Sequence, residues 1–196
     1  LFAKVFSYIP LAALLYDKIL CVHGGIGPHF LNYKELNEVE RPLTCYDFEP
    51  VGSVLWSDPS ETIDTFTPST RGSGFMYGTK GLHDFLQSQN LSVLIRGHQC
   101  AEAGVEFNLD NQVVTVFSAS FYCGRKQNKS GVLIVREPSD KMDFEYEIVT
   151  FSALRYIQRC EASFLFSSSE NSLIFSSRAV KLNLPQTPLP NPISPI

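Results

Sequence analysis

Two short apolar runs, each ending in a histidine beside glycine, place the tightest constraint on how this chain folds. Residues 18–22 lead into His23-Gly-Gly, and residues 91–96 lead into Gly97-His98. Short apolar runs bounded by glycine are typical of buried strands. Two such strands, each delivering one imidazole to a sheet edge, predict that His23 and His98 converge on one point.

The residues alone leave two interpretations of this histidine pair. Imidazole is the commonest metal ligand near neutral pH, and flanking glycines allow close approach of backbone and substrate, so one interpretation is a metal or catalytic site. The other is a pair of hydrogen-bonded histidines at strand ends. His29 and His83 have neither strand-end placement nor glycine neighbours, which predicts surface positions for both.

Composition bounds the class of protein. A chain of 196 residues can bury one sizeable core, and 44% apolar with 18% charged residues is usual for a globular domain. The net charge of -4 favours neither nucleic acid nor a membrane surface as a partner. No run reaches the about 18 consecutive apolar residues that span a bilayer. Residues 1–15 are apolar, but Lys4 interrupts them and no small-residue cleavage site follows, so no signal peptide is expected.

The cysteines indicate a reducing compartment. There are five, an odd number, widely spread and without a Cys-x-x-Cys pair: Cys21, Cys45, Cys100, Cys123 and Cys160. This pattern argues against a disulfide framework and against a structural zinc site. A cytoplasmic location, with the nucleus as a second one, is therefore expected.

The remaining pattern is mixed α/β. Helices are predicted over residues 2–15, 31–39 and 79–89, the last with Thr79 as its N-cap. Residues 59–74 are rich in Pro, Ser, Thr and Gly, which predicts a long surface loop. After Gly104 a hairpin is predicted, followed by strands over residues 131–136 and 143–151.

The end of the chain differs in composition from the rest. Residues 155–196 are rich in serine, and the closing segment carries five prolines that cannot join a sheet ladder or continue a helix. We therefore predict one domain over residues 1–154 and a disordered tail over residues 155–196.

Four further side chains are candidates for chemistry, each with a plainer alternative. Arg71 suits bidentate contact with a phosphate or carboxylate, or is a solvated loop arginine. Asp58 is a candidate ligand or base, or a turn residue before proline. Tyr122 can hydrogen-bond a substrate oxygen, or is an edge residue. Cys123 is a weaker candidate nucleophile, because no neighbour that would lower the pKa of its thiol is evident.

Four blocks of the chain follow a recognisable order, spacing and choice of residues. They are Cys21-Val-His-Gly-Gly-Ile-Gly-Pro28; Leu55-Trp-Ser-Asp-Pro59 followed by Arg71-Gly72; Ile95-Arg-Gly-His-Gln99 with Gly104-Val-Glu-Phe107; and Phe117-Ser-Ala-Ser-Phe-Tyr-Cys-Gly124. Over residues 1–151 the chain resembles the phosphoprotein phosphatase family, the serine/threonine protein phosphatases that include type 1, type 2A and calcineurin.

The resemblance implies an α/β fold, a calcineurin-like metallophosphoesterase β-sandwich flanked by helices. It also implies a binuclear centre of manganese, iron or zinc that activates a water for direct attack on phosphorus. By motif position, His23 and His98 would be two ligands of one metal. Arg71 would hold the phosphate, and Tyr122 would line the site. Phosphoprotein substrates and regulatory subunits are the expected partners, with neither nucleic acid nor membrane.

The family's blocks Gly-Asp-x-His-Gly, Gly-Asp-x-Val-Asp-Arg-Gly and Gly-Asn-His-Glu do not occur in this sequence. They supply the other metal ligands, so we expect the N-terminal half of the domain to be missing and at most one partial metal site here. Little or no phosphatase activity is then expected from the chain alone. Two alternatives stay open: a non-catalytic remnant that binds proteins, and a metallophosphoesterase that acts on nucleotides.

Overall fold

The structure, a computed structural model, describes residues 1–137 and 144–152. The described residues belong to one compact unit. The predicted tail over residues 155–196 lies outside the described residues. Within them, the longest helix spans ten residues, so none is a candidate for crossing a membrane.

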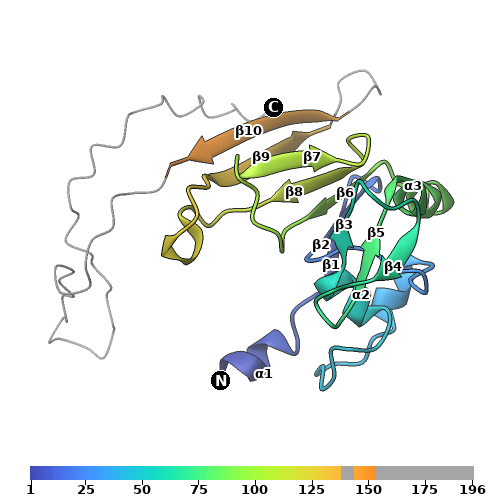
Figure 1. Ribbon diagram of the computed structural model, residues 1–196. Coiled ribbons are helices and arrows are strands. Elements are labelled where there is room, and N and C mark those ends of the chain that lie inside the picture. Colours follow the sequence, from blue (N-terminus) through green and yellow to red (C-terminus); the bar gives the residue numbers. More distant parts are fainter. Residues whose placement is uncertain (138–143, 153–196) are drawn as a thin grey trace, which may run out of the picture. The chain divides into compact units, whose positions relative to one another are not determined.

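A five-stranded sheet forms the centre of the described unit (Figure 1). Its strands, in spatial order, are β1 (Ala12–Leu15), β2 (Ile19–Val22), β6 (Val93–Arg96), β8 (Val113–Val116) and β7 (Val105–Asn108). The three inner strands β2, β6 and β8 are parallel, and β1 and β7 run antiparallel at the two edges. The parallel register pairs Cys21 with Ile95. Because of this register, the residues that follow β2 and β6 emerge at the same edge of the sheet.

Two smaller sheets and short helices complete the unit. One sheet has the order β3 (Asp58–Pro59), β5 (Phe75–Tyr77), β4 (Phe66–Pro68), and the other pairs β9 (Ser130–Arg136) with β10 (Glu145–Phe151). The helices are α1 (Phe2–Phe6), α2 (Val51–Trp56) and α3 (Thr79–Ser88), with 3-10 turns η1 (Tyr33–Asn37) and η2 (Tyr122–Gly124). The expected α/β class is therefore what the structure has.

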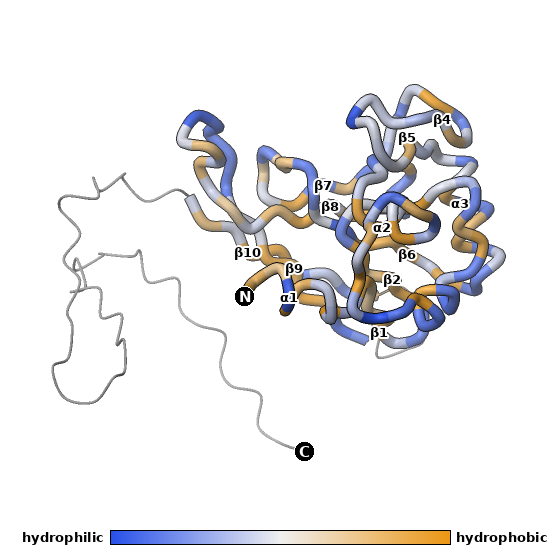
Figure 2. The backbone as a smooth tube through the Cα atoms, turned by 90° about the horizontal axis from the view of Figure 1, so that it is seen from below, coloured by the Kyte–Doolittle hydropathy of each residue, from blue (hydrophilic) through white to orange (hydrophobic). Residues whose placement is uncertain are grey.

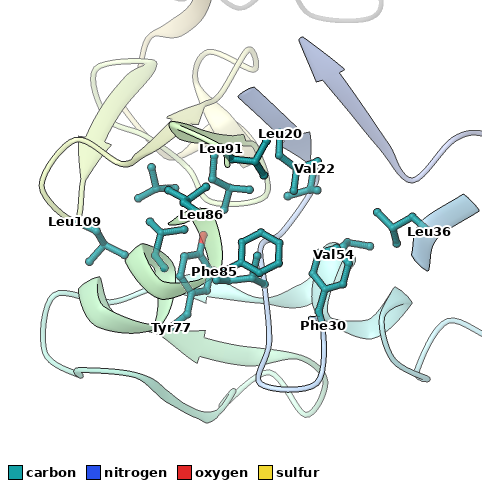
Figure 3. Close-up of a cluster of buried hydrophobic side chains, with 14 residues drawn as sticks. Leu20, Val22, Phe30, Leu36, Val54, Tyr77, Phe85, Leu86, Leu91 and Leu109 are labelled. Carbon is teal, nitrogen blue, oxygen red and sulfur yellow. The ribbon is translucent and has the colours of Figure 1, made fainter. Parts of the chain in front are cut away.

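The central sheet is covered on both faces, which is why its inner strands are mostly apolar. On one face, Leu94 of β6 belongs to the main core together with Leu82, Phe85 and Leu86 of α3. Figure 3 shows Phe85 and Leu86 in this core, with Leu20 and Val22 of β2. On the other face, Val93 joins a second cluster that includes residues of β7, β8 and β9. The tube in Figure 2 shows the inner strands β2 and β6 as hydrophobic segments. Burial on two faces makes β6 the rigid element that carries the residues after it.

The prediction of helix over residues 2–15 is wrong beyond Phe6. Residues 12–15 form the edge strand β1, which pairs antiparallel with β2. The connecting turn has Tyr16 and Asp17 at φ 52° and 53°, and the Lys18 N–H donates to the Leu15 carbonyl at 3.0 Å. A short apolar run can form either a helix or a strand. Residues 12–15 form a strand because they pair with the open edge of β2.

Two other predictions hold only in part. The segment 31–39 is helical only over the 3-10 turn η1, where the Asn32 side chain accepts a hydrogen bond from the Lys34 N–H. The predicted loop 59–74 contains β4, which pairs with β5. A strand of three residues is too short to produce a periodic pattern, so it can be recognised only from its partner.

Candidate active site

The central sheet brings His23 and His98 together, as predicted. They follow the adjacent parallel strands β2 and β6, and His23 Nε2 lies 3.0 Å from His98 Nδ1. The two rings meet edge to face, with centroids 4.8 Å apart. The Gly97 N–H donates to the His23 carbonyl at 3.0 Å, so the two loops are also joined through their backbones. Their role as metal ligands stays a prediction.

The loop after β2 lies directly on helix α2. A Cβ at Gly24 would come within 2.7 Å of the backbone of Leu55 and Trp56, so only glycine fits there. The Gly24 N–H donates to the Val54 carbonyl at 2.6 Å and thereby satisfies a carbonyl near the helix end. This contact fixes the position of the loop that carries His23 relative to the central sheet.

A buried ion pair lies beneath the imidazoles. Asp58, the first residue of β3, is 3% exposed, and Arg96, the last residue of β6, is 2% exposed. Arg96 Nη2 donates to Asp58 Oδ1 at 2.8 Å. The same guanidinium donates to the carbonyls of Gly24 and Ser57 and to Gln99 Oε1. A buried charge is tolerated when it is paired and hydrogen-bonded in this way.

Arg71 is anchored by the same carboxylate. Its Nε donates to Asp58 Oδ2 at 2.5 Å, and its side chain is 39% exposed. The terminal guanidinium nitrogens have no protein partner among the described residues. Two arginines share one carboxylate, which leaves a net positive charge beside the imidazoles. Arg71 is therefore held in place at its Nε while its terminal nitrogens stay accessible, and these nitrogens can bind an anion.

A cleft of about 700 Å³ opens beside the imidazoles. Its lining residues are His23, Thr44, Cys45, Tyr46, Asp47, Leu55, Trp56 and His98. The Trp56 ring meets the His98 ring edge-on, with centroids 5.6 Å apart. The cleft thus offers a mostly apolar and aromatic wall next to the histidine pair.

The surroundings of both imidazoles favour their uncharged form near pH 7. Burial lowers the pKa of His98 from 6.5 to about 4, with Asp58 opposing this shift and Arg71 and Arg96 adding to it. Burial and the nearby Arg96 also lower the pKa of His23. Neutral imidazole is the form that binds a metal ion, so the environment favours ligation over protonation.

The pair also fits a metal ion geometrically. Metal–nitrogen bonds are about 2.0–2.1 Å long, so two nitrogens on one ion lie no more than about 4 Å apart. His98 Nδ1 and His23 Nε2 meet this condition. The other ring nitrogen, His98 Nε2, is buried without a hydrogen-bond partner and lies 4.0 Å from Asp58 Oδ1, where a carboxylate can orient the ring. No group of three or more His, Cys, Asp or Glu side chains suited to a metal occurs within residues 1–137 and 144–152.

The shifted pKa of His98 predicts a pH dependence of stability. The folded state takes up this proton near pH 4 and the unfolded state near 6.5, so the unfolded state binds more protons between these values. The free energy of unfolding should therefore decrease as the pH falls through this window and be unaffected by His98 above it. Urea unfolding across this pH range should show a smaller decrease for His98→Gln than for wild type. His83→Gln, at an exposed histidine, should keep the wild-type dependence. Equal slopes for all three proteins would contradict the prediction.

Tyr122 is not among the residues that line the cleft beside the imidazoles, and its part in the site stays a prediction. It is 44% exposed, its ring packs edge-on against Phe117, and its N–H donates to Asn128 Oδ1 at 2.9 Å. The neighbouring Cys123 is exposed and has φ 56°. All four cysteines among the described residues are free thiols.

Sequence reasoning missed Arg96 and undervalued Asp58. The signal was present: Arg96 ends a run of buried apolar residues, and a charge in that position requires a buried counterion. The sequence does not say which carboxylate supplies it. His29 and His83 are exposed, as predicted.

Comparisons with known proteins identify a related family and a related fold. The family model of the calcineurin-like phosphoesterases matches residues 1–102. Among solved structures, the chain is similar to a protein serine/threonine phosphatase from Saccharomyces cerevisiae that has similarity to human phosphatase PP5. The sequence identity is 28% and the TM-score 0.69, over 80% of this chain and 51% of that chain. The chain thus spans about half the length of that phosphatase.

Proposed function

This chain belongs to the calcineurin-like phosphoesterase family, and from that premise we propose that it serves in hydrolysis of phosphoserine and phosphothreonine in proteins. The observation that carries the proposal is the pair of imidazoles whose facing nitrogens lie 3.0 Å apart, beside an arginine whose terminal nitrogens have no partner among the described residues. The 28% identity to a serine/threonine phosphatase supports the substrate class. Phosphoproteins are then the substrates, and regulatory subunits are candidate partners.

His23 Nε2 and His98 Nδ1 are the atoms that would hold a divalent ion, for which manganese, iron and zinc are the candidates. Such an ion, when bound, lowers the pKa of a water and polarises phosphoryl oxygens. The protein's own part is to keep both imidazoles uncharged and facing each other. Arg71, held at its Nε by Asp58, presents its terminal nitrogens to phosphate oxygens and stabilises the charge that develops on them.

The complete centre, in this proposal, holds two ions and draws on residues beyond those described. Catalytic metal sites usually have three or more protein ligands. The described residues supply two imidazoles and no larger ligand group. We therefore propose that hydrolysis depends on further ligands, and that the described residues contribute half of one site. The same observation favours, as a second candidate, a non-catalytic module that binds proteins.

Turnover of a phosphothreonine peptide by the purified chain, with manganese ions added, tests the proposal. We expect a rate at least about 100-fold below that of an intact serine/threonine phosphatase, because the ligand set is incomplete and a bound metal contributes several kcal/mol to catalysis. The residual rate should disappear in His23→Ala and in His98→Ala. It should persist in His83→Ala, a matched change at an exposed histidine.

Three outcomes are informative. A rate equal to that of the intact enzyme would show that the described ligands suffice and that the half-site proposal is wrong. A residual rate unchanged in both histidine variants would show that the imidazoles do not take part. A chain with no turnover that still binds phosphoproteins would support the non-catalytic candidate.

A further inference from the structure

Arg96 is the buried charge for which the proposed reaction has no use. Its side chain is 0% exposed, and it lies at the end of β6, the central strand that carries His98. Burying a guanidinium is costly even when it is paired with a carboxylate, and replacing such pairs by apolar residues is often neutral or stabilising. The role of Arg96 therefore requires an explanation other than stability.

The hydrogen bonds of Arg96 connect three segments that are distant in sequence. Its Nε donates to the Gly24 carbonyl at 2.7 Å, next to His23, and its Nη1 donates to Gln99 Oε1 at 2.7 Å, next to His98. Its Nη2 donates to the Ser57 carbonyl at 3.2 Å and to Asp58 Oδ1 at 2.8 Å. Each partner adjoins, or directly holds, a residue of the candidate site.

The planar shape of the guanidinium makes this connection possible. Its five N–H groups point in fixed directions within one plane, so three segments can be held at set distances. A lysine ammonium offers a point charge on a flexible stem and cannot reproduce that fork. Arg96 thus acts as a template on which the loops after β2 and β6 and the start of β3 are assembled.

We propose that Arg96 is a positioning residue: it holds His23 and His98 in one mutual arrangement and, through Asp58, directs Arg71. The 3.0 Å separation of the ring nitrogens requires one ring to donate and the other to accept, so it depends on fixed tautomers and fixed ring angles. A shift of about 1 Å at a catalytic group is enough to impair it. The inference rests on the proposed function only in assigning a purpose to this arrangement of the imidazoles. The experiments that test it do not depend on that function.

The test is the Arg96→Met variant of the full chain, followed by ¹⁵N NMR of the histidine rings without metal. Methionine has a similar length and cannot donate. We expect wild type to show one tautomer for each of His23 and His98, with one ring nitrogen hydrogen-bonded to the other. In Arg96→Met both rings should show averaged tautomers. Arg136→Met is the matched control, since Arg136 is 44% exposed and pairs with Glu147 at the surface, and its spectra should equal those of wild type.

Manganese ions alone provide the second readout. Paramagnetic broadening should affect both histidine rings of wild type at the same ion concentration. Loss of a residue that orients a ligand weakens metal binding about 10–100-fold, so Arg96→Met should need at least tenfold more manganese. Arg96→Lys should behave as Arg96→Met does, because it keeps the charge but not the fork. A lysine variant with wild-type spectra would overturn the proposal.

The remaining outcomes are also decisive. A folded Arg96→Met protein with unchanged ring spectra and unchanged manganese response overturns the proposal. If Arg96→Met does not fold, Gln99→Met decides: it removes a single acceptor from Arg96 at a half-buried position beside His98. Altered His98 signals in that variant support the proposal, and wild-type signals overturn it. No arm measures turnover, so the turnover results decide the proposed function and leave this inference untouched.

Discussion

Replacing Asp58 by asparagine is expected to lower the free energy of unfolding by about 3–5 kcal/mol, because it leaves a buried charge without its partner. Both carboxylate oxygens accept a hydrogen bond, Oδ1 from Arg96 and Oδ2 from Arg71. An amide has one accepting oxygen, so its NH₂ group would face the N–H of one arginine. Arg96 would then stay buried with a neutral partner. Urea unfolding followed by Trp56 fluorescence measures the loss.

The matched control is Asp84→Asn. Asp84 also pairs with a cation, Lys80 at 2.7 Å, but both side chains are 56% exposed. A surface pair of this kind contributes about 0.3–0.5 kcal/mol. Burial, and not the presence of a salt bridge, should therefore separate the two variants. Equal losses for Asp58→Asn and Asp84→Asn would contradict the buried network.

Replacing Leu94 by alanine is expected to cost about 2–5 kcal/mol, through lost apolar burial and the cavity left behind. Leu94 is 0% exposed and lies in β6, paired with Leu20 of β2 and Val113 of β8. Because β6 is central and packed on both faces, the surrounding strands have little freedom to close the cavity. Urea unfolding again provides the measurement.

Leu15→Ala is the control for this substitution. Leu15 lies on the edge strand β1 and is 37% exposed, so its removal should cost well below the loss at Leu94. A loss at Leu15 as large as that at Leu94 would show that the core is not centred on β6. If Leu94→Ala stays folded, weaker manganese binding at the histidine pair would show that the strand also positions the site.

Local patterns were enough for much of the fold. Apolar runs, turn residues and helical spacing predict strands β2 and β6, the β7–β8 hairpin and helix α3, and these elements lie where expected. The predicted N-cap of α3 is wrong: the cap is Gly78, and Thr79 is the first residue of the helix. The family resemblance and the calcineurin-like α/β fold are confirmed by the family model and the solved structure. The strand over residues 12–15 was missed, since a strand that depends on pairing with a neighbour cannot be told from a helix by its own composition.

The sequence by itself determined that two histidines follow two buried strands and that an arginine follows a flexible segment, because these are properties of neighbouring residues. Only the tertiary structure decided that Asp58 pairs with Arg96, 38 positions away, and also anchors Arg71. The physical reason is that the desolvation cost of a buried charge must be offset in space, by whichever segment the strand order places beside it. Strand order is a property of the whole sheet, so the arrangement beneath the imidazoles cannot be derived from any one motif.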